Sequence, residues 1–287
     1  MRAGTVMVFA RLAAVLLAPI LLVTAVAPTH ASEEVPFVTT PDPVAQAMLE
    51  LARVKRRDYV IDLGSGDGRI VILAAKRFGA RGLGVEIVPD LVRRSVSNAQ
   101  RAGVSRRVEF REQDLFKTDL SGATVITMYL LPEVNLKLRP ALLALKPGTR
   151  VVSHDWDMGE WLPDRSLTLD VPEKSIGREK VSRIHLWVVP AQVDGLWCSV
   201  GKAHEVSLRV AQSFQAFKAE LLGPVSVPVV DGRIGGRRLA ITQRGADDLQ
   251  FAVIANKLRV TRARGKFAPL VARVFERAAG DACGSAR

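Results

Sequence analysis

The fold of this chain is decided by residues 59–68, which read YVIDLGSGDG. The first five residues are apolar apart from one acid, which predicts a short buried strand, and a glycine-rich turn follows at once. After the turn, Ile70, Leu73, Ala74 and Phe78 recur at helical spacing and give a helix one apolar face. Strand, tight turn and helix in this order predict the opening unit of an α/β sheet.

Strands and helices continue to alternate as far as Pro190. Further strands are predicted at residues 82–87, 108–112, 123–131 and 149–153. Helices are predicted at 89–102 and 132–145, the second broken into two pieces by Pro140. A hairpin of 166–171 and 183–189 is expected to close the sheet. The pattern predicts a doubly wound α/β sheet over residues 59–190.

An N-terminal helical segment, residues 32–58, precedes this sheet. Asp42 is expected to cap its helix, with Pro43 at the first helical position. The apolar stripe of the helix consists of Val44, Ala47, Met48 and Leu51.

Residues 191–287 have a different pattern, which predicts a small antiparallel β domain, either a curled sheet or a partial barrel. Two groups of apolar residues alternate with polar ones: Trp197, Val206, Leu208, Val210 and Phe214, and later Leu249, Phe251 and Val253. The sequence gives this domain no role. The only cysteines are Cys198 and Cys283, which either form one disulfide or stay as a buried thiol and a free one.

Residues 1–31 are typical of a secretory signal. Arg2 and Arg11 precede an uncharged apolar run at 12–27, and small residues around Ala31 suit a cleavage site. An uncleaved membrane anchor is the alternative, because the run approaches the roughly 20 residues that span a bilayer. Either interpretation predicts export, to a periplasmic or other extracytoplasmic location, and the anchor would also keep the chain near a membrane.

The formal charge is +12, from 41 Lys and Arg against 29 Asp and Glu. The longest basic run is only three residues, Lys55 to Arg57. We therefore expect a soluble basic surface and no specific nucleic-acid site.

Three acids follow three successive predicted strands. Asp62 ends the first, Glu86 ends the second, and Asp114 follows the third, with Leu115 and Phe116 beside it. Open α/β sheets bind ligands at this edge. Glu86 can accept hydrogen bonds from both hydroxyls of a ribose, and its replacement is expected to leave the fold intact.

The glycine spacing favours one nucleotide over another. A dinucleotide site needs G-x-G-x-x-G, whereas Gly64, Gly66 and Gly68 read G-x-G-x-G. Asp67 within the turn would repel a pyrophosphate. A sulfonium cofactor that carries an ammonium group and no phosphate suits this acidic turn, which favours S-adenosylmethionine over NAD.

The chain resembles the class I methyltransferases that methylate lysine in the mitochondrial ATP synthase c-subunit and adenine nucleotide translocase, and their exported bacterial relatives. The resemblance rests on Thr39-Thr40-Pro41, residues 62–71, Gly84-Val85-Glu86, Leu91-Val92 and Asp114-Leu115. It implies a seven-stranded sheet in which Asp62 and the glycines hold the methionine part, Glu86 the ribose, and Asp114 with Leu115 the adenine. The expected cofactor-binding set is Asp62, Gly64, Ser65, Gly66, Gly68, Glu86, Asp114 and Leu115.

Candidate acceptor residues follow two later strands. Tyr129 stands where many amino-methylating relatives have an Asn/Asp-Pro-Pro-aromatic turn, and the missing polar residue argues against nucleobase methylation. His154 and Asp155 could receive or orient an amine; a loop anchored by Trp156 is the structural alternative. No cluster has metal-ligand spacing, so no metal is expected.

The expected activity is methyl transfer from S-adenosylmethionine to a lysine of a protein substrate. The alternative is a non-catalytic envelope protein that binds a ligand or partner with the same fold. Export conflicts with a cofactor made in the cytosol, which keeps this alternative open.

Overall fold

The computed structural model describes residues 1, 4, 38–174, 179–200, 206–223, 226–242 and 247–283. The expected signal or anchor at 1–31 lies outside the described residues, apart from Met1 and Gly4. Among the described helices, none is long and apolar enough to cross a membrane.

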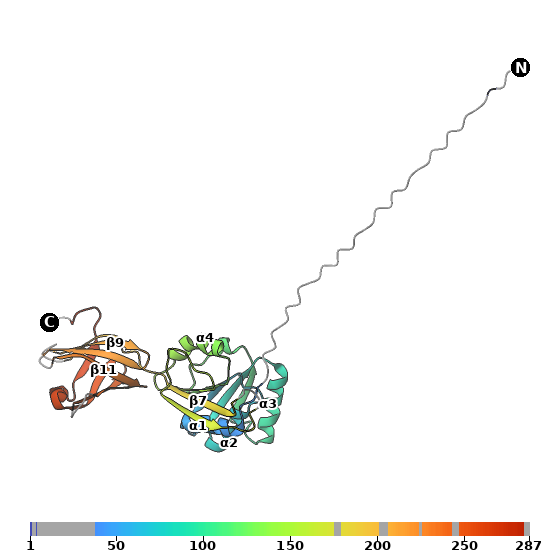
Figure 1. Ribbon diagram of the computed structural model, residues 1–287, viewed down its shortest axis with the longest axis horizontal. Coiled ribbons are helices and arrows are strands. Elements are labelled where there is room, and N and C mark those ends of the chain that lie inside the picture. The colour runs from blue at the N-terminus through green and yellow to red at the C-terminus, as the bar shows by residue number, and fades with distance from the viewer. Residues whose placement is uncertain are drawn as a thin grey trace. The chain divides into compact units, whose positions relative to one another are not determined.

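One mixed sheet forms in the order β3-β2-β1-β4-β5-β7-β6 (Figure 1). Its strands are β1 (Tyr59–Leu63), β2 (Arg81–Glu86), β3 (Val108–Glu112), β4 (Val125–Met128), β5 (Arg150–His154), β6 (Arg165–Asp170) and β7 (Val181–Val188). The first five are parallel, and β7 pairs antiparallel with both β5 and β6. The predicted seven-stranded α/β sheet and its closing hairpin are therefore confirmed.

Helices cover both faces of the sheet. They are α1 (Asp42–Leu51), α2 (Arg69–Phe78), α3 (Pro89–Arg101) and α4 (Pro132–Leu143), with a short 3-10 helix η1 (Leu115–Lys117). Val60 packs in a core with α1 and α2, whereas Ile61 packs in a second core with α4. Because successive residues of a strand point to opposite faces, a strand covered on both sides must be apolar throughout.

Two helix predictions were wrong in detail. The α1 helix begins at Asp42, with Pro41 in the capping position, and the Asp42 side chain caps nothing but lies 3.7 Å from Arg69. Pro140 sits inside a continuous α4 and does not divide it. Leu138 and Leu142, buried on either side of Pro140, stabilise the helix enough to tolerate the lost backbone hydrogen bond.

The order of the strands fixes where a ligand can bind. The chain runs outward from β1 to β3 and then crosses back, so that β4 lies on the other side of β1. A crevice forms where the direction of the crossovers reverses, at the carboxyl ends of the strands. The glycine turn follows β1 at this point.

A closed antiparallel barrel follows the sheet, in the order β10-β11-β12-β13-β14-β15-β8-β9. Its elements are β8 (Gly195–Ser199), β9 (Ser207–Ser213), β10 (Ala216–Leu222), β11 (Val227–Gly235), β12 (Arg238–Thr242), β13 (Asp248–Ile254), β14 (Lys257–Arg264), η2 (Gly265–Leu270) and β15 (Val274–Arg277). The predicted β domain is confirmed, and its ladder closes fully. Trp197, Phe251 and Phe275 are buried in its core.

Phe214 does not belong to the core of the barrel, as its alternation had suggested. It lies in the turn after β9 with φ of 53°, and its ring stacks 6.4 Å from Trp161 in a core of the sheet. Side chains alternate between the two faces of a sheet only within a strand. Beyond Ser213, where β9 ends, odd or even position therefore does not predict which residues face the core of the barrel.

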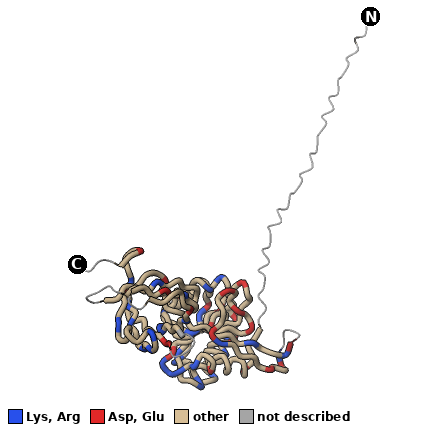
Figure 2. The backbone as a smooth tube through the Cα atoms, turned by 60° about the vertical axis from the view of Figure 1, so that its left-hand side comes forward, with Lys and Arg blue, Asp and Glu red and all other residues tan. Residues whose placement is uncertain are grey.

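Cys198 and Cys283 form a disulfide that joins β8 to the end of the described chain. Of the two alternatives left open by the sequence, the structure has the bridge. Basic residues occur throughout the described chain with acidic residues among them (Figure 2).

Candidate active site

The glycine turn is held tightly against the second strand. The backbone N–H groups of Gly64 and Ser65 both donate to the Val85 carbonyl, each at 2.9 Å. Gly68 begins α2 with φ of 80°, and a Cβ there would lie 2.6 Å from the Phe110 ring. Only glycine combines this conformation with this close approach.

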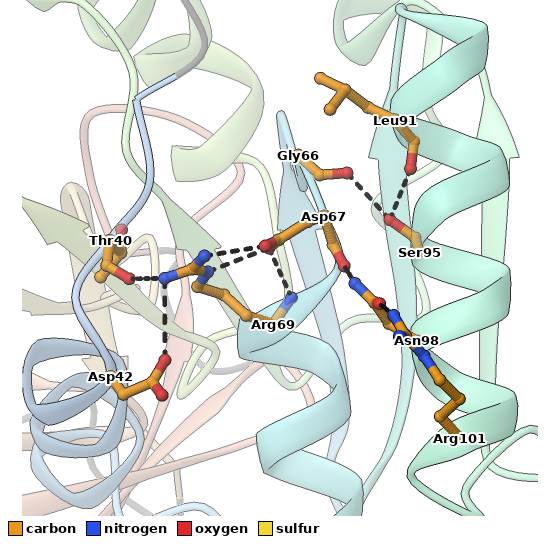
Figure 3. Close-up of polar contacts among 9 residues, drawn as sticks. All are labelled: Thr40, Asp42, Gly66, Asp67, Arg69, Leu91, Ser95, Asn98 and Arg101. Carbon is orange, nitrogen blue, oxygen red and sulfur yellow. Dashed lines mark hydrogen bonds and ion pairs between the residues drawn. The ribbon is translucent and has the colours of Figure 1, made fainter.

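Helix α3 fixes the same turn from another side (Figure 3). The Ser95 hydroxyl donates to the Gly66 carbonyl, and the Asn98 amide donates to the Asp67 carbonyl, each at 2.8 Å. With its carbonyls bound in this way, the turn keeps one shape before any ligand arrives.

Three carboxylates are nearly inaccessible at this point, with exposed fractions of 2 % for Asp62, 8 % for Asp67 and 9 % for Glu86. Asp67 pairs with Arg69 at 2.8 Å. Glu86 accepts three backbone N–H groups, from Gly66, Ile87 and Val88, at 2.8–3.0 Å. Asp62 accepts one hydrogen bond, from the Thr127 hydroxyl at 2.7 Å.

Asp62 is the least compensated of the three. Burial raises its pKa to about 7, the hydrogen bond from Thr127 opposes this rise, and the charges of Glu86 and Asp67 add to it. A cation bound beside Asp62 would favour the ionised carboxylate. The site is therefore suited to a positively charged ligand.

Asp114 and Leu115 lie just beyond β3, as predicted. The Asp114 carboxylate accepts the Phe116 N–H at 2.9 Å and so caps η1. Leu115 packs, partly buried, against the core on the α4 side of the sheet. The short helix thus has a fixed position at the end of the third strand.

The structure brings the three acceptor candidates together. The Tyr129 hydroxyl donates to Asp155 Oδ2 at 3.2 Å, and the rings of Tyr129 and His154 lie 3.9 Å apart. Burial raises the pKa of Tyr129 to about 12, and the negative charge of Asp155 adds to the rise. Tyr129 is therefore a hydrogen-bond donor at neutral pH and not a base.

His154 is fully buried, and protein groups engage both of its ring nitrogens. Nδ1 lies 3.1 Å from the Thr40 hydroxyl and Nε2 lies 2.9 Å from the Ser182 hydroxyl. Burial lowers its pKa to about 4, so the ring is neutral at physiological pH. These contacts suit a side chain that positions Tyr129 and Thr40 better than one that receives an amine.

Asp155 has an unusual backbone conformation, with φ of 63°. Burial alone would raise the pKa of its carboxyl group, but a hydrogen bond from Lys174 and the nearby His154 lower it overall. The carboxylate also accepts the Arg183 N–H at 3.0 Å. Aspartate adopts this left-handed conformation more readily than most non-glycine residues, so the chain can turn sharply after β5 without a glycine.

A pocket of about 400 Å³ opens beside these residues, lined among others by Thr39, Arg69, Tyr129, His154 and Lys174. It lies between the N-terminal segment, the start of α2 and the ends of β4 and β5. It is the candidate acceptor pocket.

Arg69 and Thr40 connect this pocket to the glycine turn, and sequence reasoning missed both roles. The Arg69 guanidinium donates to the Asp67 carboxylate at 2.8 and 3.0 Å and to the Thr40 carbonyl at 2.9 Å (Figure 3). The Thr39-Thr40-Pro41 segment was part of the resemblance, but nothing in its pattern indicated what it would contact. Lys174 and Thr127 also gave no signal in the sequence.

Residues 62–165 match the ANTKMT methyltransferase domain. A protein-lysine N-methyltransferase from Saccharolobus islandicus is 45 % identical over 138 residues, which cover 47 % of this chain and 86 % of the relative. The chain belongs to the ANTKMT methyltransferase family. The barrel lies outside the matched residues.

Longer relatives and a solved structure are also similar. The mouse adenine nucleotide translocase lysine N-methyltransferase is 39 % identical over 132 residues, 45 % of this chain and 57 % of the relative, so the chain spans about half of that protein. The crystal structure of an RNA methyltransferase from Salinibacter ruber, in complex with S-adenosyl-L-homocysteine, is 54 % identical and covers 54 % of this chain and 96 % of that chain, with a TM-score of 0.49.

The cofactor of this methyltransferase is S-adenosylmethionine, and the residues at the strand ends fit it. The methionine part of this cofactor carries an ammonium and a sulfonium. Either positive charge would favour the ionised form of the buried Asp62 carboxylate. Within the described residues the buried Ser65 hydroxyl has no hydrogen-bond partner and is free to meet a ligand. The Asp67 carboxylate within the turn disfavours a pyrophosphate, and Arg69, the nearest cation, is already paired with Asp67.

We predict that S-adenosylmethionine binding weakens as the pH falls below about 7. The pKa of Asp62 is raised to about 7, so the ionised form that pairs with the cofactor is lost on acidification. Affinity should fall by up to about tenfold per pH unit, because one proton is linked to binding. Calorimetry between pH 6 and 8 measures this dependence, and His154, with a pKa of about 4, does not titrate in that range.

The matched variant is Asp62→Asn, which keeps the shape and removes the charge. It should bind weakly at every pH, with no slope. A wild-type affinity that does not change with pH would contradict the placement of the cation at Asp62.

We predict that Glu86→Ala destabilises the fold as well as weakening cofactor binding. The sequence suggested that the fold would be unaffected, but Glu86 accepts the Gly66 N–H inside the turn. A buried donor left unpaired costs about 1–3 kcal/mol of unfolding free energy. Loss of a carboxylate that also receives ribose hydroxyls should weaken S-adenosylmethionine binding roughly 10- to 150-fold.

Urea unfolding and calorimetry measure the two effects separately, and Glu109→Ala is the control, since Glu109 is half-exposed on the neighbouring strand. Unchanged cofactor affinity in folded Glu86→Ala protein would rule out the ribose role.

Proposed function

We propose that this methyltransferase transfers the methyl group of S-adenosylmethionine to the side-chain amine of a lysine in a protein substrate. The Saccharolobus islandicus relative is a protein-lysine methyltransferase, and the mouse relative is named for a lysine in a protein. The observation that carries the proposal is an ionised carboxylate, that of Asp155, beside the candidate acceptor pocket.

S-adenosylmethionine, when bound, supplies an activated methyl group for in-line attack by an amine. Positioning and exclusion of water therefore matter more than a strong base. Asp62, the glycine turn and Glu86 hold the cofactor from the β1 and β2 side. Asp155, held by the Tyr129 hydroxyl, orients the ammonium of the acceptor, and this ammonium gives up one proton to solvent before its nitrogen attacks.

Two alternatives are less well supported. After β4 the chain reads Tyr129-Leu130-Leu131-Pro132, with no side-chain amide or carboxylate to receive the amino group of a nucleobase. A non-catalytic envelope protein needs a retained fold but no acceptor pocket, whereas here Tyr129 and His154 line a pocket and both contact Asp155.

We predict that the chain labels lysine when incubated with methyl-tritiated S-adenosylmethionine and a lysine-rich protein. Acid hydrolysis followed by amino-acid analysis should give radioactive methyl-lysine. Asp155→Asn should lower kcat/KM about 10- to 150-fold, the loss expected for one charge-assisted hydrogen bond.

The same acceptor with acetylated lysines is the control and should take up no label. Label that appears in added RNA and not in protein would show a nucleic-acid acceptor instead. Cofactor binding without label in either acceptor would favour the non-catalytic alternative.

We further propose that the chain after Ala31 lies outside the cytoplasm. The signal-like residues 1–31 and the Cys198–Cys283 disulfide both support this, because disulfides persist in oxidising compartments. The proposal requires that S-adenosylmethionine reaches that compartment.

We predict that the two cysteines resist alkylation in cells that express the full chain and react in cells that express residues 32–287. Mass spectrometry after alkylation without reductant reads both states directly. Free thiols in the full chain would contradict export.

A further inference from the structure

Lys174, which follows β6, is one of the residues that line the candidate acceptor pocket. Its Nζ lies 2.8 Å from Asp155 Oδ2 and donates to the Val181 carbonyl at 2.6 Å. Its side chain is only 12 % exposed, and that of Asp155 only 15 %. The chain thus holds one of its own lysines against the carboxylate assigned to the acceptor.

The same oxygen of Asp155 receives the Tyr129 hydroxyl at 3.2 Å. An ammonium at this point therefore contacts two oxygens, a carboxylate and a backbone carbonyl, and the Tyr129 hydroxyl holds the carboxylate in place. A primary ammonium, with three N–H donors, can use both oxygens together. Lys174 and Tyr129 both line the pocket of about 400 Å³.

The position of this cluster relative to the cofactor site follows from the chain. Tyr129 comes directly after β4, and Thr127 of that strand donates to Asp62. On the other side of the pocket, Arg69 is bound to Asp67 of the glycine turn. Lys174 therefore lines a pocket whose walls are connected to the cofactor turn.

A purely structural ion pair is the alternative explanation. Other lysine pairs lie near the surface, such as Lys257 with Glu276, whose side chains are 54 % and 50 % exposed. Burying an ion pair gains little stability, because desolvation of both charges offsets their attraction. The Lys174–Asp155 pair is far less exposed than that surface pair and lies beside the candidate acceptor pocket, which favours a role in binding.

We propose that the Asp155 carboxylate and the Val181 carbonyl form the binding site for the ammonium of an acceptor lysine, with the Tyr129 hydroxyl holding Asp155 in place, and that Lys174 occupies this site until an acceptor displaces it. This inference rests on the proposed lysine acceptor. The exchange replaces one ammonium by another, so Asp155 keeps a partner throughout. If a neutral acceptor side chain displaced Lys174, the Asp155 carboxylate would lose its positively charged partner.

Removal of Lys174 should open the site to a free amine. In Lys174→Ala, n-butylammonium should bind at millimolar concentration and raise the Tm, and 1-butanol, its neutral counterpart, should not. The wild type and Lys218→Ala, which lacks an exposed lysine of the barrel, should show no shift with either compound. The double variant Lys174→Ala, Asp155→Asn should lose the response.

Activity gives a second measurement. With a lysine peptide as acceptor, Lys174→Ala should lower the KM for the peptide roughly 3- to 10-fold, because an internal competitor is gone. The KM for S-adenosylmethionine should not change. Lys174→Gln keeps most of the side-chain length but removes the charge, and it should also lower the KM for the peptide. This variant is the control for any effect of the cavity that alanine leaves.

Amine binding is measured without cofactor, so it tests the subsite even if no methyl transfer occurs. Equal responses of wild type and Lys174→Ala to n-butylammonium would overturn the inference, as would a response that survives Asp155→Asn. Selective amine binding without methyl transfer would instead leave the subsite standing and count against the proposed function.

Discussion

Buried negative charge at the carboxyl ends of β1 and β2 is the constraint on which the rest of this site depends. Asp67 is neutralised by Arg69, and Glu86 is satisfied by three backbone N–H groups. Asp62 has the Thr127 hydroxyl and the repulsion of two neighbouring carboxylates. A turn so arranged attracts a cation and repels a phosphate, which is why a sheet of nucleotide-binding type holds a sulfonium cofactor.

Arg69, which pairs with Asp67, also connects the cofactor turn to the acceptor pocket. Arg69 reaches from the turn to the Thr40 carbonyl, and the Thr40 hydroxyl meets His154 at the end of β5. The ring of His154 in turn packs against the ring of Tyr129. The segment before α1 therefore belongs to the site, because it joins the cofactor turn to the pocket wall through direct hydrogen bonds.

Burial divides the roles of the acceptor residues. Desolvation keeps His154 neutral and Tyr129 protonated, while hydrogen bonds keep Asp155 ionised. The Asp155 charge thus lies beside the pocket, next to the neutral rings of Tyr129 and His154, and the acidic Asp42 and Glu173 are among the residues that line the pocket. Such a site holds an ammonium in place without offering a strong base, and this suits a reaction limited by alignment and not by proton removal.

The sequence by itself determined the parts of this protein that local pattern controls. The bounds of β1 and β3, the glycine turn and the three strand-end acids follow from apolar periodicity and from conformations open only to glycine. The antiparallel character of the second domain followed from alternation in the same way. The pattern did not predict the exact start of α1, which begins at Asp42 and not after it. It also did not predict that α4 continues through Pro140.

Only the tertiary structure decided which distant residues meet. The cysteines 85 positions apart, the hydrogen bond between Thr40 and His154, and the ion pair of Lys174 with Asp155 depend on how strands far apart in sequence are ordered in the sheet and barrel. Such polar side chains produce no periodic pattern in the sequence. Each one pairs with a single partner, whereas apolar residues repeat because they cover a whole face of a helix or strand. The sequence therefore predicted the chemistry of the cofactor turn, whereas the residues of the acceptor pocket were identified only from the tertiary structure.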